Sequence, residues 1–227
     1  MSKAISPFRE LTAKIGHQIH KIQADFDALL ELIDRDFSEA NELAFCLAAE
    51  CEKLTLMARS LPLESGRPRS AGRMEQVMLE NFPVEIRVNE SGQFHMSFPA
   101  LLPRKERGSP EYIRGALYPA MRRFFDGRPR VHFRNCVVIF RHVYNRRRPA
   151  RRYRDHDNIE VNAVVDLLAL FLLDDDAPLF CSHFYTSAQG EADRTEVVVL
   201  APSEFPRWLY GEKTAEKGAL PIRENPP

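Results

Sequence analysis

The residues with the clearest capacity for chemistry are aspartates that follow a run of arginines. Asp155 and Asp157 are separated by one residue, so in an extended segment their carboxylates point to the same side and can share one hard cation. Mg²⁺ prefers oxygen ligands and commonly takes one or two carboxylates together with phosphate oxygens and water. The arginine-rich stretch 146–154 directly precedes this pair and could hold those phosphates. The pattern therefore indicates Mg²⁺-assisted chemistry on a phosphate-bearing molecule.

The helix expected over residues 158–172 carries further polar residues in an ordered pattern. Apolar residues occupy most of its circumference, which predicts that it is buried. Asn158, Asn162 and Asp166 are spaced four apart and form one stripe. A buried aspartate is costly unless it is paired or metal-bound. Asp166 is therefore either hydrogen-bonded in the core or part of an active site, and the run Asp174–Asp176 closes the helix at its other end.

Charge is segregated along the chain although the formal net charge is zero. Residues 104–154 contain sixteen Lys and Arg residues and three acids, so the rest of the chain carries the balancing negative charge. Such a dense, arginine-dominated stretch favours a phosphate-bearing partner over a merely solvated basic face. His156, between the two aspartates, is interpreted as a surface histidine, with a general acid or base as the alternative.

Composition limits the remaining classes of protein. The chain has 227 residues, and its hydrophobic content of 44% is enough for a packed core. Its four cysteines show no CxxC spacing, which argues against a structural zinc site or a disulfide framework and fits a reducing cytosol. Neither a signal peptide nor a membrane-spanning run is evident, so the sequence predicts a cytoplasmic protein without membrane contact.

The first 62 residues predict a helical hairpin. Apolar residues recur at spacings of three and four over residues 8–33, and again in a second helix expected to begin at Ser38 as N-cap and to end at Pro62. The apolar face of the hairpin (residues 8–61) must find the main domain, a second subunit or a partner helix. Residues 63–82 are rich in Gly, Ser, Pro and Arg near their start and are interpreted as a linker.

Residues 83–202 predict an α+β domain. The expected elements are a β-hairpin over 84–98, a helix over 109–125, a strand within 131–144, the helix 158–172, and two strands near 179–186 and 195–200 that are joined by a turn at Gln189-Gly190. This order predicts an antiparallel or mixed sheet with two helices packed on one side. Residues 203–227 are expected to form a C-terminal tail that ends in frayed, Pro-rich sequence.

The same residues resemble the RusA family of Holliday-junction resolvases, which are small homodimeric, Mg²⁺-dependent endonucleases that nick four-way DNA junctions. The resemblance covers about residues 94–201 and rests on the Pro-rich strand with its basic segment, the arginine run, the motif Asp155-His156-Asp157-Asn158, and the later aspartates. It implies branched DNA as partner, Mg²⁺ as cofactor and a homodimer.

By motif position the resemblance implies the roles of several residues. The implied catalytic residues are Asp155, Asp157, Asp166 and Asp176, and the implied metal ligands are Asp155, Asp157, Asp175 and Asp176. Asn158 and Asn162 are implied to be supporting residues. The DNA-binding residues expected from the basic segments are Arg104, Lys105, Arg107, Arg147, Arg148, Arg151, Arg152 and Arg154. The whole chain also resembles an uncharacterised protein family of Firmicutes mobile elements.

Two features depart from the RusA pattern. The family carries a lysine in the helix after its D-x-D-N motif, and the corresponding positions here are Val161 or Asn162, depending on the end from which one counts. The chain has no lysine between Lys105 and Lys213, so a group that could stabilise transition-state charge is missing, and an arginine would have to substitute for it. The N-terminal hairpin is the second departure, because compact resolvases lack it.

Three functions are therefore compatible with the sequence. The first is a Mg²⁺-dependent, structure-selective DNA endonuclease. The second is a DNA-binding module of the same fold that has lost hydrolysis together with its lysine. The third is a protein-interaction scaffold in which the charges are structural.

Overall fold

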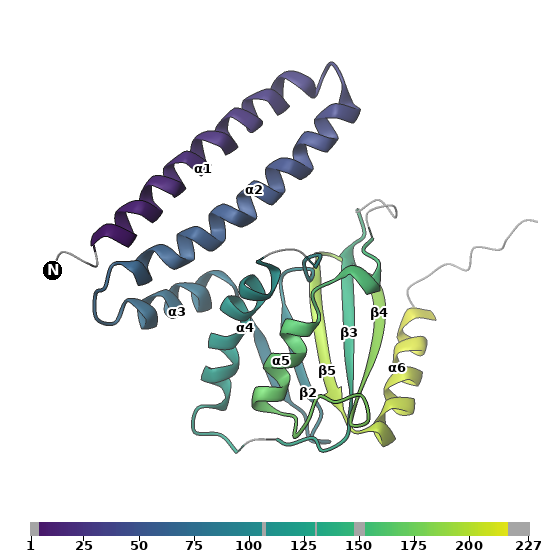
Figure 1. The fold of residues 1–227 in the computed structure, drawn as a ribbon. Helices are drawn as coiled ribbons and strands as arrows, with labels where there is room; N and C mark the ends of the chain where they lie inside the picture. Colours follow the sequence, from purple (N-terminus) through teal and green to yellow (C-terminus); the bar gives the residue numbers. More distant parts are fainter. Residues whose placement is uncertain (1–4, 106–107, 130, 148–152, 218–227) are drawn as a thin grey trace, which may run out of the picture. The chain divides into compact units, whose positions relative to one another are not determined.

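The computed structural model describes residues 5–105, 108–129, 131–147 and 153–217, and its elements are shown in Figure 1. The chain divides into two compact units. The first comprises residues 1–81 with 107–115, and the second comprises residues 82–106 with 116–227. In the described part of the chain, no helix is both long enough and apolar enough to cross a membrane.

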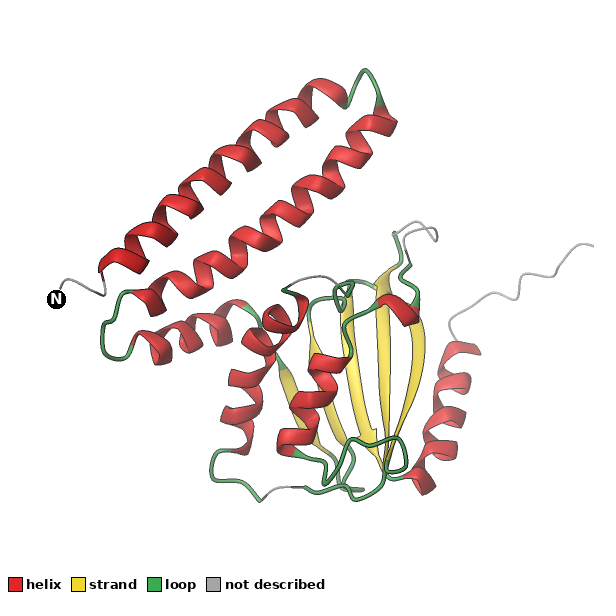
Figure 2. Cartoon of the chain, viewed as in Figure 1, coloured by secondary structure: helices red, strands yellow, loops and turns green. Residues whose placement is uncertain are grey.

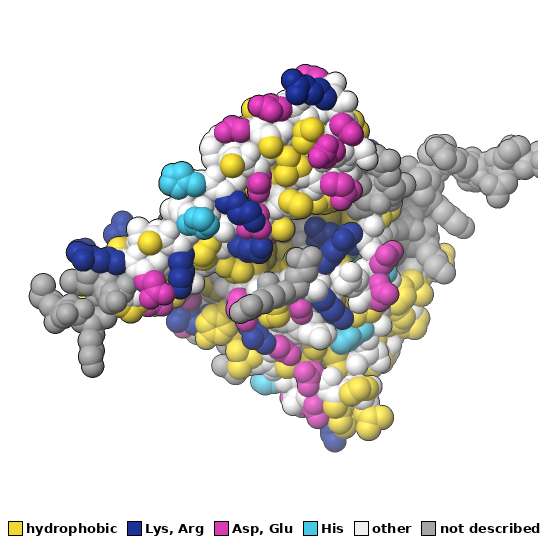
Figure 3. Space-filling model, turned by 45° about the horizontal axis from the view of Figure 1, so that its top comes forward, with side chains coloured by type: hydrophobic (Ala, Val, Ile, Leu, Met, Phe, Trp, Pro, Cys, Tyr) yellow, Lys and Arg dark blue, Asp and Glu magenta, His cyan; other side chains and the backbone are white. Residues whose placement is uncertain are grey.

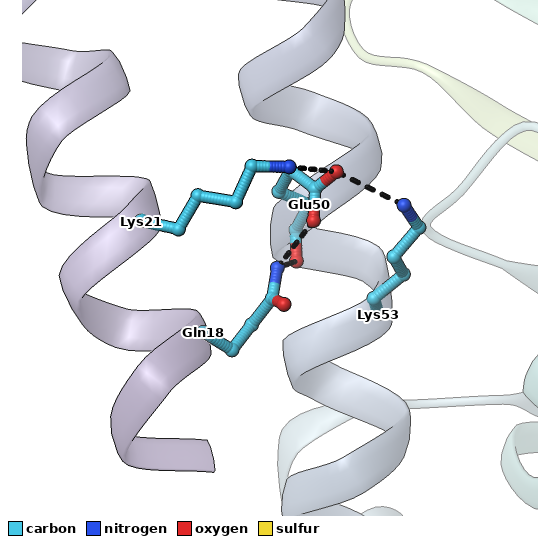
Figure 4. Close-up of polar contacts among 4 residues, drawn as sticks. All are labelled: Gln18, Lys21, Glu50 and Lys53. Carbon is cyan, nitrogen blue, oxygen red and sulfur yellow. Dashed lines mark hydrogen bonds and ion pairs between the residues drawn. The ribbon is translucent and has the colours of Figure 1, made fainter. Parts of the chain in front are cut away.

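The first unit contains the predicted hairpin, formed by α1 (Ile5–Leu32) and α2 (Phe37–Glu64). Each helix presents to the other a row of partly buried residues at alternating spacings of three and four, as in a coiled coil. The apolar members of these rows are Leu11, Ile15, Ile22 and Leu29 in α1 and Leu43, Leu47, Leu54 and Met57 in α2. Glu50 interrupts the apolar row of α2 and is held by Gln18, Lys21 and Lys53 (Figure 4).

Three details of this unit differ from the sequence predictions. The N-cap of α2 is Asp36, whose carboxylate accepts the backbone N–H groups of Ser38 and Glu39. Pro62 does not end α2 but lies in its last turn, and the helix continues to Glu64. The expected linker contains a helix, α3 (Ser70–Asn81), because its second half has good helix formers between the Gly-Pro-rich start and Phe82.

The second unit is built on a five-stranded mixed sheet, so the expected α+β class is confirmed (Figure 2). Its strands are β1 (Glu85–Val88), β2 (Phe94–Phe98), β3 (Cys136–Asn145), β4 (Cys181–Gly190) and β5 (Arg194–Leu200). They lie in the order β1-β2-β5-β3-β4; β3 and β4 are parallel, and the other neighbours are antiparallel. The predicted β-hairpin, β1 with β2, is confirmed.

The predicted pairing of the last two strands is wrong. β4 runs through Gln189 and Gly190, where a turn was expected, and pairs with β3 at the edge of the sheet. β5 instead lies between β2 and β3. Its run Val197–Leu200 is buried throughout, which suits a central strand that is covered on both faces, whereas β4 is largely half-buried or exposed.

Helices cover both faces of this sheet. On one face, α5 (Asn162–Phe171) and the part of α4 (Ser109–Phe125) from residue 116 on contribute aromatic rings to the core; Phe125 stacks near both Phe94 and Phe171. On the other face, α6 (Phe205–Lys217) places Phe205 and Trp208 against a buried cluster of β3 and β5 residues. The prediction of helices on one face only was therefore wrong, and residues 205–217 of the expected tail form α6, whose apolar side chains cover the second sheet face.

Candidate nucleic-acid interface

The D-x-D-N motif forms a short 3₁₀ turn, η2 (His156–Asn158), between β3 and α5. Asp155 precedes the turn with extended backbone angles, and the N–H of Asn158 donates to the carbonyl of Asp155 at 3.4 Å. Asp155 and Asp157 are both exposed. Since a 3₁₀ turn has three residues per turn, the two carboxylates do not follow the alternation of an extended strand, and that expectation is corrected.

His156 anchors this turn to the sheet. Its Nε2 lies 3.1 Å from the hydroxyl of Ser187 on β4, and its ring stacks on that of Tyr185 with centroids 5.6 Å apart. The side chain is half-buried rather than a free surface histidine. Anchoring the central residue of D-x-D inward leaves the flanking aspartates facing solvent.

A second anchor lies just before the turn. The backbone N–H of Arg154 donates to the hydroxyl of Tyr144 at 3.0 Å, and the guanidinium of Arg154 donates to the carbonyls of Leu101 and Leu102. This arginine, which was predicted to bind DNA, therefore directs its charge onto buried backbone oxygens. We assign it a positioning role for the turn, because these bonds tie the segment before Asp155 to Tyr144 on β3 and to residues 101–102, which follow β2.

Behind the turn lies a buried histidine that sequence reasoning missed. His142 on β3 is 1% exposed, and its Nδ1 lies 3.4 Å from the hydroxyl of Tyr144. Burial lowers the pKa of His142 to about 4, and the nearby charges of Arg154 and His156 act in the same direction. Its imidazole is therefore neutral at pH 7. The only signal in the sequence was a histidine in the middle of an apolar strand.

Two basic residues lie directly beside the turn. Residues 103–105 run antiparallel to residues 158–160: the N–H of Glu160 donates to the carbonyl of Pro103 at 2.8 Å, and that of Lys105 to the carbonyl of Asn158 at 3.3 Å. Arg104 and Lys105 are both exposed. The structure thus brings the backbone of two predicted DNA-binding residues next to Asn158, the last residue of the D-x-D-N turn.

Further basic residues follow β3, at the same end of the strands as η2. Arg147 is exposed, and its backbone N–H donates to the side chain of Asn145. Arg146 forms an exposed ion pair with Glu191 at 3.3 Å. Nearby, the ring of Tyr153 stacks on Tyr144. The remaining predicted DNA-binding residues lie outside the described part of the chain: Arg107, Arg148, Arg151 and Arg152.

The polar stripe of α5 was predicted to be buried and is instead the solvent-facing side of the helix. Asn162 and Asp166 are exposed, and Leu170, four residues further on, is 59% exposed. The other faces of α5 are buried. The helix is therefore amphipathic, with a narrow polar side on which Asp166 lies.

The later aspartates lie at the opposite end of α5 from the D-x-D-N turn. The ten residues of α5 span about 15 Å. The N–H of Asp174 donates to the carbonyl of Phe133, before β3 begins, whereas η2 lies near Ser187 towards the end of β4. Asp175 accepts the N–H of Ala177, and Asp176 is exposed. The structure does not bring Asp175 and Asp176 together with the pair before α5.

The acidic side chains near η2 are the candidate ligands for Mg²⁺. Among the described residues, no three His, Cys, Asp or Glu side chains are arranged to hold a metal ion. Glu160, a buried acid next to the turn, uses its carboxylate to accept the N–H of Ala163 and caps α5. The exposed pair Asp155 and Asp157 remains. Each of these two carboxylates is the kind of oxygen ligand that Mg²⁺ takes together with phosphate oxygens and water.

Comparison with known proteins adds one finding. No curated protein and no solved structure matches the chain. One family model matches residues 4–225, and so nearly the whole chain, hairpin included. The chain therefore belongs to the family of unknown function DUF6100.

Proposed function

We propose that the second unit is a RusA-like domain that binds branched DNA through the basic edge around η2. The observation that carries this proposal is the pairing of residues 103–105 with residues 158–160, which holds Arg104 and Lys105 beside the D-x-D-N turn. Arg147 extends the positive charge along the end of β3. Exposed arginine and lysine side chains on a rigid edge contact phosphate oxygens and position a nucleic acid without reading its bases.

The binding function is tested by fluorescence anisotropy with a labelled immobile four-way junction and a linear duplex of the same length, over a series of salt concentrations. Each lost phosphate contact reduces the salt slope by about one. Arg104→Gln with Lys105→Gln should therefore weaken binding to both DNAs and lower the slope by about two. A junction-selective protein should keep its preference in this double variant.

A matched control carries the same change of charge at the other end of the sheet. Arg134 and Arg207 are both exposed. Arg134 precedes β3, and Arg207 lies in α6, which follows β5; the start of β3 and the end of β5 pair with each other. Arg134→Gln with Arg207→Gln should leave the salt slope unchanged. The proposal fails if the wild type does not bind DNA at low salt, or if both double variants lower the slope equally.

A second candidate function is Mg²⁺-dependent nicking of branched DNA, favoured by the two exposed carboxylates beside these basic residues. Asp155 or Asp157 would hold the ion together with DNA phosphate oxygens, and the ion would supply charge stabilisation and an activated water. Arg104 and Lys105 would orient the phosphate. The helix lysine of the RusA pattern is absent, so one of these cations would also have to stabilise the developing charge.

Nicking is tested on the same junction with Mg²⁺ or Mn²⁺. Asp155→Asn with Asp157→Asn should abolish symmetric nicks. The variant should bind DNA as well as the wild type or more tightly, because two negative charges are removed from the protein surface that faces DNA. Asp175→Asn with Asp176→Asn is the comparison: it should leave nicking intact, since these residues lie beyond α5. Loss of nicking in both variants would mean that the two ends of α5 act together. Binding by the wild type without nicking under either metal would exclude this second function.

A further inference from the structure

The hairpin carries a second row of apolar residues that its own two helices do not cover. Ile19 and Phe26 in α1 and Ile33, the residue after it, recur every seven residues and are 50%, 43% and 50% exposed. Leu30, at 55%, lies between them on the same face, and Phe37, the first residue of α2, is 66% exposed. This row is displaced by about a quarter turn from the row that packs against α2. A helix with two adjacent heptad rows fits an assembly of more than two helices.

The area of this outer row (Ile19, Phe26, Leu30, Ile33 and Phe37) is large enough for a specific contact. Large apolar side chains bury roughly 150–250 Å² each, so five half-exposed ones leave about 500 Å² on one copy. Two copies facing each other would bury about 1,000 Å², near the lower limit for a specific protein interface. A patch of this size on a single chain commonly marks an interaction site.

The charge of the hairpin selects the occupant and its direction. Residues 25–42, around the connection between the helices, contain seven acids and one arginine. Residues 5–21 of α1 are positive, with Arg9, Lys14 and Lys21 against Glu10. Figure 3 shows acidic and hydrophobic side chains next to each other over the end of the hairpin where α1 meets α2. A second copy in the same direction would stack two acidic ends, whereas an antiparallel copy places each acidic end beside Lys21 of the other.

We infer that the hairpin associates with a second copy of itself, antiparallel and through the outer row, to form a four-helix bundle. The two-fold axis crosses α1 between Phe26 and Leu30, the middle of the row. The row is then self-complementary, as a two-fold contact requires. This association does not depend on the proposed DNA-binding function, and it uses the unit that the RusA pattern lacks.

The experiment is sedimentation velocity on the full chain over a range of concentrations. The wild type should be dimeric at micromolar concentration. Phe26→Asp should weaken the dimer by at least about 100-fold, because each dimer then places two charges in the centre of its interface. Leu179→Asp is the control: Leu179 is 85% exposed and lies in the second unit, so this variant should remain dimeric. Circular dichroism should show unchanged helix content in both variants.

Orientation is tested by cross-linking in a Cys46→Ser and Cys51→Ser background, since these two cysteines are exposed. Leu30→Cys, near the axis, should cross-link efficiently with a short bismaleimide, and Phe37→Cys, far from it, should not. Efficient cross-linking at Phe37 would overturn the antiparallel direction. A monomeric wild type, or a dimer that Phe26→Asp leaves intact, would overturn the association itself.

Discussion

Glu50 is the residue at which the stability of the hairpin can be tested most directly. It occupies a position in the apolar row of α2, and its side chain is 12% exposed. Lys21 donates to its carboxylate at 2.8 Å, Gln18 at 2.5 Å and Lys53 at 2.9 Å. These hydrogen bonds, led by that of Lys21, lower the pKa of Glu50 to about 2. Glu50→Gln removes the charge while it preserves size and shape.

The expected magnitude follows from this pKa. The ordinary value is 4.5, and a pKa held about 2.5 lower corresponds to a ceiling of about 3 kcal/mol for the charged form in the folded protein. Lys21 and Lys53 are 49% and 62% exposed, so water screens both ion pairs. Glu50→Gln should therefore destabilise the hairpin by about 1–2 kcal/mol at pH 7. Because the folded-state pKa is depressed, this contribution is complete above pH 4.5 and is lost as the pH falls towards 2.

Native-state hydrogen exchange of the α1 and α2 amides measures this loss within the hairpin alone. The difference between wild type and Glu50→Gln should shrink steadily between pH 4.5 and pH 2. Glu10→Gln is the matched control: Glu10 forms an ion pair with Lys14 at 2.7 Å, but both side chains are more than 60% exposed, so little change is expected. A difference at Glu50 that stays constant from pH 7 to pH 3, or an equal effect of both variants, would refute the reasoning.

The second unit yields two further predictions. Burial holds the pKa of His142 near 4, below its ordinary 6.5, so the free energy of unfolding should be greatest above pH 6.5 and fall as the pH drops towards 4. His142→Phe should flatten this pH dependence, measured by urea unfolding followed by tryptophan fluorescence. An unchanged pH profile in the variant would contradict the assignment. Trp208→Ala should cost about 2 kcal/mol in unfolding followed by circular dichroism, since the ring packs with Phe205 on the second sheet face. Tyr210→Ala on the same helix, where the side chain is 73% exposed, should cost much less, and equal losses would mean that α6 is not docked through Trp208.

Local patterns predicted the fold well wherever the chain is punctuated by Pro and Gly. The helix over 109–125 was predicted with the bounds that α4 has, because Ser109-Pro110 begins it and Asp126-Gly127 follows it. The β1–β2 hairpin was predicted for a similar reason. The placement of β5 could not be predicted in this way, because it depends on pairing with strands far away in the sequence.

The candidate site was predicted in part. The D-x-D-N turn and the segment that carries Arg104 and Lys105 lie together. Asp175 and Asp176 do not join them, because the helix that separates the two acidic groups in sequence also separates them in space. The inward-facing bonds of Arg154 and the burial of His142 depend on β3 and on residues 101–102, and no local pattern reports such contacts.

The position of β5 also constrains when the second unit can form during synthesis. This strand is the last of the five to leave the ribosome, and it fills the centre of the sheet between β2 and β3. A nascent chain that ends before Leu200 exposes the unpaired edges of both neighbours, which are templates for pairing with other chains. The hairpin, made of local contacts, can fold as soon as it emerges, whereas the sheet must wait for almost the whole chain. Chains truncated before β5 should therefore be aggregation-prone.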